Sequence, residues 1–217
     1  MLREGYEYTV DDYYCYPGTC VLKNKLNIMD AQALNEAERK ITSLRIAQAL
    51  QDGVLGDFDF NHLKKIHFFL FSDIYEWAGK SRVVNISKED MFCNCIYIAD
   101  QMEILFNQLK SENFLKNCQT QKELADRLAY YMGEINAIHP FREGNGRTER
   151  LFIQFLAESL GYDILFQRVN PDDMLKACID SFNGDYDRLE KLMFCCLQRS
   201  TDSSLVSATF NNRRQNG

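Results

Sequence analysis

Hydrophobic residues recur every three to four positions along most of the chain, the spacing that gathers them on one face of an α-helix. Residues 32–51 show this pattern, and the face predicted to be buried carries Leu34, Ala37, Ile41, Leu44 and Leu50. Residues 57–79 predict a second helix, with Asp59 or Asn61 as its N-terminal cap and Gly79 as its stop. Its apolar positions are Phe60, Leu63, Ile66, Phe69, Leu70, Ile74 and Trp77.

The second half of the chain predicts four more helices. Residues 121–138 place Leu124, Leu128, Met132, Ile135 and Ile138 on one stripe, and Pro140 then ends the helix. Residues 147–162 resume the helical spacing and close at Gly161. Residues 172–182 and 185–200 carry the same pattern.

Residues 81–98 differ, because they are short, β-branched and interrupted at SKED, which predicts a small β-hairpin. Residues 201–217 show no apolar stripe and are expected to form a loose tail. The pattern therefore predicts an all-α fold with one β-hairpin, in a single domain over residues 1–200.

Composition excludes several classes of protein. The chain has 217 residues, 46% of them hydrophobic and 26% charged, which fits one folded domain with a sizeable core. A net charge of -6 argues against a nucleic-acid binder that works through a basic surface. No apolar run is long enough to cross a bilayer, and the first residues lack the order of a secretory signal. We therefore expect a cytoplasmic protein that binds neither nucleic acid nor membrane.

The chain has eight cysteines but no CxxC pair. Cys93 with Cys95 and Cys195 with Cys196 have spacings that suit zinc poorly, and no histidine follows at finger distance. Reduced thiols and no disulfide are the expectation for a cytosolic chain.

Candidate chemistry is concentrated in HPFREGNGRTER, residues 139–150, between two predicted helices. Gly144 and Gly146 allow consecutive N–H groups to converge on an anion, and the following helix adds its own N-terminal N–H groups. Arg147 and Arg150 are three positions apart, so both guanidinium groups can face the same phosphates. Together these residues predict a phosphate-binding cradle.

Two further side chains in this stretch suit group transfer. Glu143 offers an oxygen ligand of the kind that magnesium takes, and His139 can accept a proton near neutral pH. The stretch therefore predicts phosphoryl or nucleotidyl transfer. Each feature alone is more often structural, and it is their joint order that carries the prediction. No GxxxxGK[ST] motif is present, and GNGRTE lacks the third glycine of GxGxxG. His62 and His67 are five positions apart, which does not suit a ligand pair, so we expect both to be structural.

The stretch resembles the motif HPFx(D/E)GN(G/K)R of the Fic family, and the match is complete through Arg147. Arg150 stands where the AMP-transferring branch of that family carries a second arginine. YPGTCVLKNKLNI, residues 16–28, resembles a segment of one Fic subgroup, with Cys20 for the usual Asp and Asn27 for the usual Gly. IYEWAG followed by VNIS resembles the family's helix end and flap. The resemblance spans about residues 16–165.

The resemblance implies a Fic-type helical domain with a small β-hairpin flap, here at about residues 80–97. It implies transfer of AMP from ATP to a Ser, Thr or Tyr hydroxyl of a target protein, with release of pyrophosphate. Carried over residue by residue, it makes His139 the general base and Glu143 the ligand of Mg2+. The remaining assignments are Gly144, Asn145 and Gly146 as the anion hole, with Asn145 also counted as catalytic, Arg147 and Arg150 as clamps on the β- and γ-phosphates, Phe141 as the anchor of the loop, and Asn85, Ile86, Ser87 and Lys88 as the flap that aligns the target.

Alternatives remain open at this point. The chain could transfer another phosphate-containing group, remove AMP, or serve as a catalytically silent binding module. Gly146 favours AMP transfer, because members that phosphorylate tend to carry Lys there. Within the subgroup, small bacterial toxins often modify topoisomerase subunits, whereas secreted effectors modify host GTPases and usually append a delivery domain. Since the chain ends about 50 residues after the motif helix, with no delivery domain, a bacterial cytoplasmic toxin is expected.

Many Fic proteins carry an inhibitory helix with the pattern (S/T)xxxE(G/N). Only Ser72 and Glu76 have the Ser/Thr-to-Glu spacing here, and Trp77 follows them in place of Gly or Asn. The resemblance therefore predicts that a separate small antitoxin supplies the inhibitory glutamate to Arg150.

Overall fold

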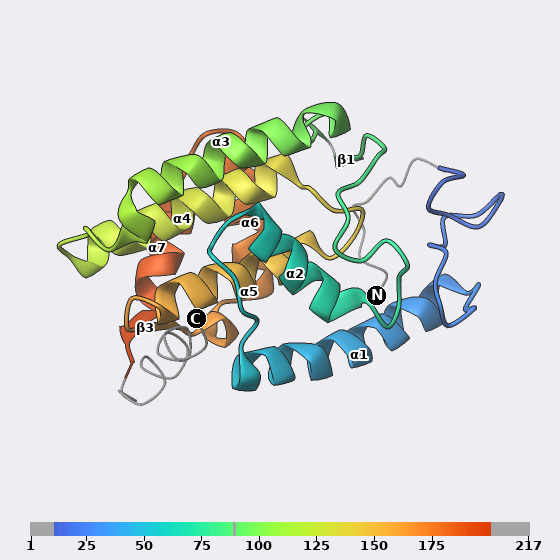
Figure 1. Cartoon of the computed structure of the whole chain (residues 1–217), viewed down its shortest axis with the longest axis horizontal. Coiled ribbons are helices and arrows are strands. Elements are labelled where there is room, and N and C mark those ends of the chain that lie inside the picture. Colours follow the sequence, from blue (N-terminus) through green and yellow to red (C-terminus); the bar gives the residue numbers. More distant parts are fainter. Residues whose placement is uncertain (1–10, 89, 201–217) are drawn as a thin grey trace, which may run out of the picture.

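The computed structural model describes residues 11–88 and 90–200 (Figure 1). The tail expected at residues 201–217 lies outside the described residues. Within them the chain forms seven α-helices: α1 (Ala31–Asp52), α2 (Phe60–Phe71), α3 (Ile98–Ser111), α4 (Gln121–Ile138), α5 (Asn145–Glu158), α6 (Pro171–Phe182) and α7 (Asp187–Cys196). None of these helices is long and apolar enough to cross a bilayer.

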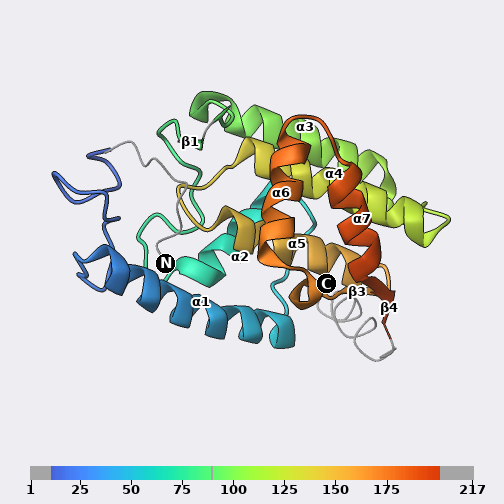
Figure 2. The same cartoon turned by 180° about the vertical axis from the view of Figure 1, so that it is seen from behind.

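Helices α4 and α5 form the centre of the molecule (Figure 2). α4 packs against α3, α5, α6 and α7, and α5 also packs against α2. The whole predicted stripe of α4, from Leu124 to Ile138, is buried. Thr120 caps the start of α4 by accepting a hydrogen bond from the N–H of Glu123, and the helix ends two residues before Pro140, where proline forbids continuation. The prediction for this helix is confirmed.

The predicted buried face of α1 is right at Leu34 and Ile41 but wrong at Leu44 and Leu50. Leu44 is 75% exposed and Leu50 is 43% exposed, whereas Glu38 and Thr42 are buried. The reason is that α1 runs along one edge of the molecule (Figure 1). It turns a partly polar face toward Arg147 in the first turn of α5. Hydrophobic spacing alone cannot reveal such a face, because its polar residues are buried only through partners far away in the sequence.

Helix α2 begins as predicted, since the carboxylate of Asp59 accepts a hydrogen bond from the N–H of His62 at 2.7 Å. It ends at Phe71 and not at Gly79, so the predicted length is wrong. After Phe71 the chain turns back over the helix, and Gly79 adopts a φ of +76°. A Cβ atom at Gly79 would lie only 2.9 Å from the Cβ of Phe68, so this close return requires glycine.

The expected hairpin is present but much shorter than residues 81–98. β1 (Ser87–Lys88) pairs antiparallel with β2 (Asp90–Met91). A second small sheet was not predicted: β3 (Tyr162–Ile164) pairs antiparallel with β4 (Leu197–Arg199), at the end of the predicted helix 185–200. α3 also escaped the sequence reading. Three-residue strands contain too little alternation to be detected by periodicity. The predicted class, mostly helical with a small β-hairpin, is confirmed.

Candidate active site

The loop between α4 and α5 and the first turns of α5 hold the residues singled out in the sequence. His139 caps the end of α4 in the left-handed region, with φ 51°, and its N–H donates to the carbonyl of Ile135. Gly144 precedes α5 with φ 82°, and a Cβ atom there would lie 2.2 Å from the ring of Phe71. Gly144 is therefore required by both conformation and space. Gly146 has no positive φ, and its added Cβ would contact the guanidinium of Arg150 at 3.1 Å.

The side chain of Asn145 closes this loop. Its Oδ1 accepts from the N–H of Phe141 and its Nδ2 donates to the carbonyl of Phe141, both at 2.8 Å. Phe141 is buried, as expected of an anchor. Because the Asn145 amide is occupied in this way, its predicted role toward phosphate falls to its backbone N–H.

His67 supports the loop from α2. The Gly79 N–H donates to its Nδ1 at 2.8 Å, so the proton of the neutral ring lies on Nε2, which donates to the carbonyl of Glu143 at 3.0 Å. Its ring stacks on Phe141 with centroids 3.9 Å apart. Burial lowers the pKa of His67 to about 3, although the bond to the Glu143 carbonyl opposes the shift. His67 therefore stays neutral, in a structural role like that of buried His62.

The ring of His139 is oriented by two contacts. Nδ1 lies 3.2 Å from the carbonyl of Asn136, and since a carbonyl can only accept, the neutral ring carries its proton on Nδ1 and its lone pair on Nε2. Phe92 from the flap segment stacks on the ring, with centroids 3.9 Å apart and planes within 17°. This tautomer suits a base that accepts a proton at Nε2.

Glu143 lies between the start of α5 and an arginine. Its Oε1 accepts from the N–H of Gly144 at 2.8 Å and is 3.3 Å from Nη2 of Arg147. No group of three or more His, Cys, Asp or Glu that could hold a metal occurs among residues 11–88 and 90–200. A single carboxylate fits Mg2+ that is shared with nucleotide phosphates, because this ion binds through one or two carboxylates and the substrate.

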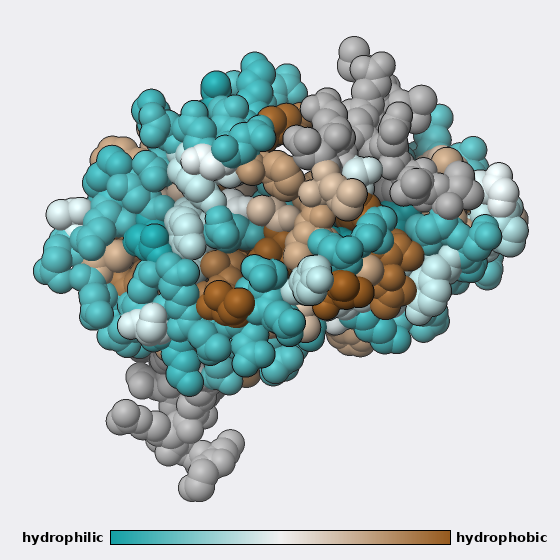
Figure 3. Space-filling model, turned by 90° about the horizontal axis from the view of Figure 1, so that it is seen from above, coloured by the Kyte–Doolittle hydropathy of each residue, from teal (hydrophilic) through white to brown (hydrophobic). Residues whose placement is uncertain are grey.

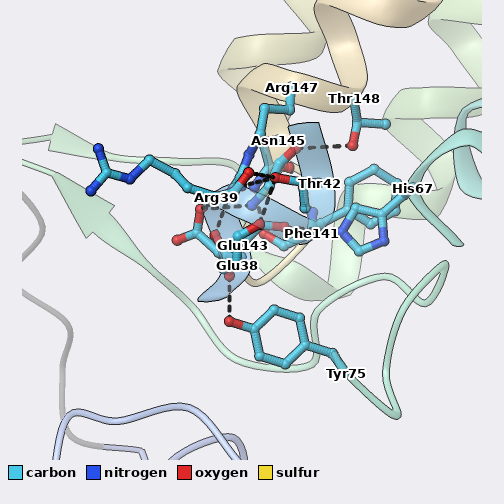
Figure 4. A network of polar contacts seen from close by, with 11 residues as sticks. Glu38, Arg39, Thr42, His67, Tyr75, Phe141, Glu143, Asn145, Arg147 and Thr148 are labelled. Atoms are coloured by element: carbon cyan, nitrogen blue, oxygen red, sulfur yellow. Dashed lines mark hydrogen bonds and ion pairs between the residues drawn. The ribbon is translucent and has the colours of Figure 1, made fainter. Parts of the chain in front are cut away.

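Arg147 is held by side chains of α1 and of its own loop (Figure 4). Its Nη2 donates to Oε1 of Glu38 at 2.6 Å, and its Nη1 donates to Oγ1 of Thr42 at 3.0 Å. Burial alone would lower the pKa of the Arg147 guanidinium, but the carboxylates of Glu38 and Glu143 raise it above the ordinary value. Arg147 is therefore protonated inside the site, and its positive charge is balanced by the carboxylates of Glu38 and Glu143.

The residues of the predicted phosphate cradle lie at the N-terminus of α5. The first N–H with a partner four residues back is that of Thr148, which donates to Gly144 at 3.1 Å. The N–H groups of residues 145–147 precede it and have no such partner within the helix. Arg150, half-buried, lies beside this turn, and the described part of the chain gives it no ion pair. N–H groups and a guanidinium at a helix start suit phosphate.

The flap segment lies next to the loop. Asn85 Oδ1 accepts from the N–H of Cys95 at 2.9 Å, and the Ile86 carbonyl accepts from the N–H of Phe92 at 3.3 Å. Ser87 and Lys88 form β1. Figure 3 shows hydrophobic side chains interrupting the otherwise mostly hydrophilic surface of one face. The flap segment exposes several large apolar side chains: Val83, Met91, Ile96 and Tyr97.

Arg82 joins the flap to the loop and was missed in the sequence. Its guanidinium donates to the carbonyls of His139 and Val84, each at 2.8 Å, of Ile138 at 3.3 Å, and also of Cys93. The side chain is 2% exposed, and burial lowers its pKa. No sequence signal pointed to it, because its partners are backbone groups that every residue carries.

The sequence analysis also did not predict that Glu38, Thr42 and Tyr75 belong to the site. Glu38 and Thr42 share a stripe with Leu34 at spacings of four residues, which is the one signal that could have indicated a buried polar face on α1. The eight cysteines, all described, form no disulfide.

Comparison with known proteins matches residues 57–157 to the Fic/DOC family. The probable protein adenylyltransferase y4lH of Sinorhizobium fredii is 41% identical over 81% of this chain and 91% of its own length. The chain belongs to the Fic/DOC family. The probable protein adenylyltransferase Fic of Escherichia coli is 36% identical over 83% of this chain and 90% of its own length. Protein adenylyltransferase VbhT of Bartonella schoenbuchensis is 41% identical over 84% of this chain, which spans 38% of that longer relative.

Solved structures agree with this assignment. The BepC effector of Bartonella tribocorum with bound AMPPNP has a TM-score of 0.80 at 26% identity, covering 89% of this chain and all of that one. A Fic domain of Bartonella quintana with bound ADP has a TM-score of 0.81, also at 26% identity, covering 88% of this chain and 97% of that one. The expected family, fold and nucleotidyltransferase class are confirmed.

Proposed function

We propose that this Fic enzyme transfers AMP from ATP to the hydroxyl of a target protein through the loop of residues 139–150. The observation that supports it best is the continuity of the site: His139, Glu143 and the first turn of α5 follow one another at the junction of α4 and α5. His139 accepts the hydroxyl proton at Nε2 while the oxygen attacks the α-phosphorus. The bond from that phosphorus to the bridging oxygen breaks, and pyrophosphate leaves.

The phosphates lie against the start of α5. The N–H groups of Asn145 and Gly146 bind their oxygens, and Arg150 balances their charge. Arg147 donates three of its five N–H groups to Glu38, Thr42 and Glu143, so the other two are the ones that bind phosphate.

Gly144 reaches phosphate only after an exchange, because Glu143 now accepts its N–H at 2.8 Å. Glu143 would be the residue that holds Mg2+, and its carboxylate would then no longer accept this N–H. The ion, when bound, offsets the charge of the phosphates. Gly144 then completes the anion hole with Asn145 and Gly146.

The target lies along the flap. Asn85, Ile86, Ser87 and Lys88 present main-chain groups that can pair with an extended segment, and exposed Val83 and Met91 offer apolar contacts beside it. This arrangement brings a Ser, Thr or Tyr hydroxyl toward His139. A topoisomerase subunit in the bacterial cytoplasm is the target we would test first.

Regulation involves a small antitoxin. Arg150 has no ion pair among the described residues, and it stands beside the phosphate cradle. A glutamate brought by a partner protein would form a bidentate pair there and displace the nucleotide. Assaying the chain alone, with the product of the neighbouring gene, and with that product's glutamate changed to Gly tests this part separately. Inhibition that survives the change to Gly would contradict it.

The decisive test of the reaction is mass spectrometry of target protein incubated with the chain and ATP. A mass increase equal to AMP is expected on a hydroxyl side chain. An increase equal to phosphate would establish the alternative transfer, and loss of AMP from a pre-modified target would establish removal. No change with a verified target would indicate the silent binding module.

A further inference from the structure

Glu38 of α1 enters the site although it belongs to no part of the motif. Its Oε1 accepts from Nη2 of Arg147 at 2.6 Å, and its Oε2 accepts from the hydroxyl of Tyr75. The residue is 7% exposed, and Figure 4 shows its side chain between Tyr75 on one side and Arg147 on the other. Both oxygens of the carboxylate are therefore used, one by the motif and one by the segment after α2.

Thr42, one turn further along α1, holds the other branch of the same guanidinium. Its hydroxyl donates to the Glu38 carbonyl at 2.8 Å and accepts from Nη1 of Arg147 at 3.0 Å. Two consecutive turns of a helix thus grip both terminal nitrogens of Arg147. A planar guanidinium held at both ends has one orientation, whereas one contact would leave it free to rotate.

The grip continues into the motif. Nη2 of Arg147, fixed by Glu38, is also 3.3 Å from Oε1 of Glu143, and that oxygen accepts the Gly144 N–H. The guanidinium that Glu38 holds is therefore in direct contact with the carboxylate proposed to hold the metal. The pKa of Tyr75 is raised by burial and by the nearby Glu38, so its hydroxyl keeps the proton that it donates.

We propose that Glu38 is a positioning residue for the transfer reaction: it orients Arg147 and, through Arg147, Glu143. The proposal rests on the roles assigned above to these two motif residues. A glutamate beside a motif arginine also invites comparison with an inhibitory contact. The anchoring favours positioning, because Glu38 cannot swing away from Arg147 without also leaving the buried Tyr75 hydroxyl. Its partner is Arg147, moreover, and Arg150 remains outside the pair.

The test is a double-mutant cycle on the rate of AMP transfer, with Glu38→Ala, Arg147→Ala and the pair. Because a misplacement of about 1 Å can cost on the order of 100-fold, we expect Glu38→Ala alone to lower the rate by roughly 10- to 100-fold. In the Arg147→Ala background the same change should have no further effect, since the group it acts through is gone. Glu36→Ala, an exposed site on the same helix, is the matched control and should leave the rate unchanged.

ATP affinity, measured by calorimetry without a target protein, gives a readout that mere loss of packing would not move. Glu38→Gln keeps the size of the side chain and an acceptor for Arg147, so it should retain more affinity and rate than Glu38→Ala. It also carries the test if the alanine variant fails to fold. Independent, multiplying losses in the double variant would overturn the proposal. A rise in rate on removing Glu38 would also overturn it and assign an inhibitory role. If Arg147→Ala transfers AMP normally, the assigned role of Arg147 fails instead, and Glu38 with it.

Discussion

Arg82 and Arg147 stand at opposite ends of the motif loop and are held by different kinds of partner. Arg147, at the start of α5, meets the carboxylates of Glu38 and Glu143. Arg82, behind His139, donates to four backbone carbonyls and has no carboxylate partner in the part of the chain that the structure describes. The positive charge of Arg147 is balanced by carboxylates, whereas that of Arg82 is stabilised by the dipoles of backbone carbonyls.

The difference follows from what each end must do. The carbonyls of Ile138 and His139 are at the C-terminus of α4, where a helix leaves acceptors unpaired and favours a cation. Arg82 therefore holds the backbone around His139 and links it to Val84 and Cys93 of the flap. Arg147 lies where we propose that the phosphates bind, and its carboxylate partners hold the guanidinium in one orientation. Arg82, bound to backbone carbonyls, thus fixes the conformation of the loop, whereas Arg147, bound to carboxylates, fixes the position of a positive charge.

The largest effect should come from breaking the charged pair. Arg147→Met leaves the buried Glu38 carboxylate without its cation, which costs ~3–5 kcal/mol of unfolding free energy. Adding Glu38→Leu removes that orphan charge, so the double variant should recover part of the loss. Urea unfolding of the three proteins measures this. A double variant less stable than Arg147→Met would show that the charge is not the source of the cost.

A smaller loss is expected at the other end of the loop. Arg82→Met leaves acceptors that are neutral, each costing about 1–3 kcal/mol when buried and unpaired, and some of them regain water. We expect a total of roughly 2–4 kcal/mol, with no second substitution able to restore it. Arg82→Lys, with three donors on one nitrogen, should recover only part. Full recovery by Lys would mean that the fork geometry is unimportant.

Glu149 is a buried ionisable residue of a third kind, because its Oε2 accepts no hydrogen bond from any side chain or backbone group among the described residues. Burial raises the pKa of this carboxyl from 4.5 to about 8, against the opposing effect of Arg150. Between these values the folded protein keeps a proton that the unfolded chain has lost. Stability should therefore fall as pH rises, by up to ~1.4 kcal/mol per pH unit.

Glu149→Gln should remove this fall, so the variant gains on the wild type between pH 5.5 and 7.5 by about 2–3 kcal/mol, from the same slope. Urea unfolding at both pH values measures it, with exposed Glu103→Gln as the control. Equal gains by both variants would show that burial of Glu149 is not the cause.

The smallest effect concerns the aromatic stack on the base. Phe92→Leu keeps an apolar side chain but removes the ring that lies 3.9 Å from the His139 ring. Such pairs contribute about 0.5–1.5 kcal/mol, so AMP transfer should fall by roughly 2- to 12-fold at unchanged ATP affinity. Loss of ATP affinity in this variant would place Phe92 in the nucleotide site instead.

The sequence predicted what is local. The motif residues lie within twelve positions, and α4 carries its own stop signal in Pro140. Asp59, one of the two predicted caps, likewise marks the start of α2. These features depend on neighbours in the chain, so periodicity and capping chemistry suffice to find them.

The features that the sequence did not predict depend on partners far away in the chain. Glu38 and Arg147 are 109 positions apart, and Arg82 lies 57 positions before His139. The polar buried face of α1 was misassigned for the same reason, since apolar Leu44 satisfied the helical pattern better than Glu38 did. A buried polar residue can be found only together with the group that satisfies it.

The central claim is that His139 is the base of an AMP transfer carried out on this loop, and ATP labelled at the α-phosphate tests it most directly. Incubated with target protein, the wild-type chain should transfer the α-label, and ATP labelled at the γ-phosphate should leave the protein unlabelled. His139→Ala, with ATP affinity retained, should lower α-label transfer by about 10²–10⁴-fold. Transfer by His139→Ala at the wild-type rate, or γ-label on the target, would contradict the account.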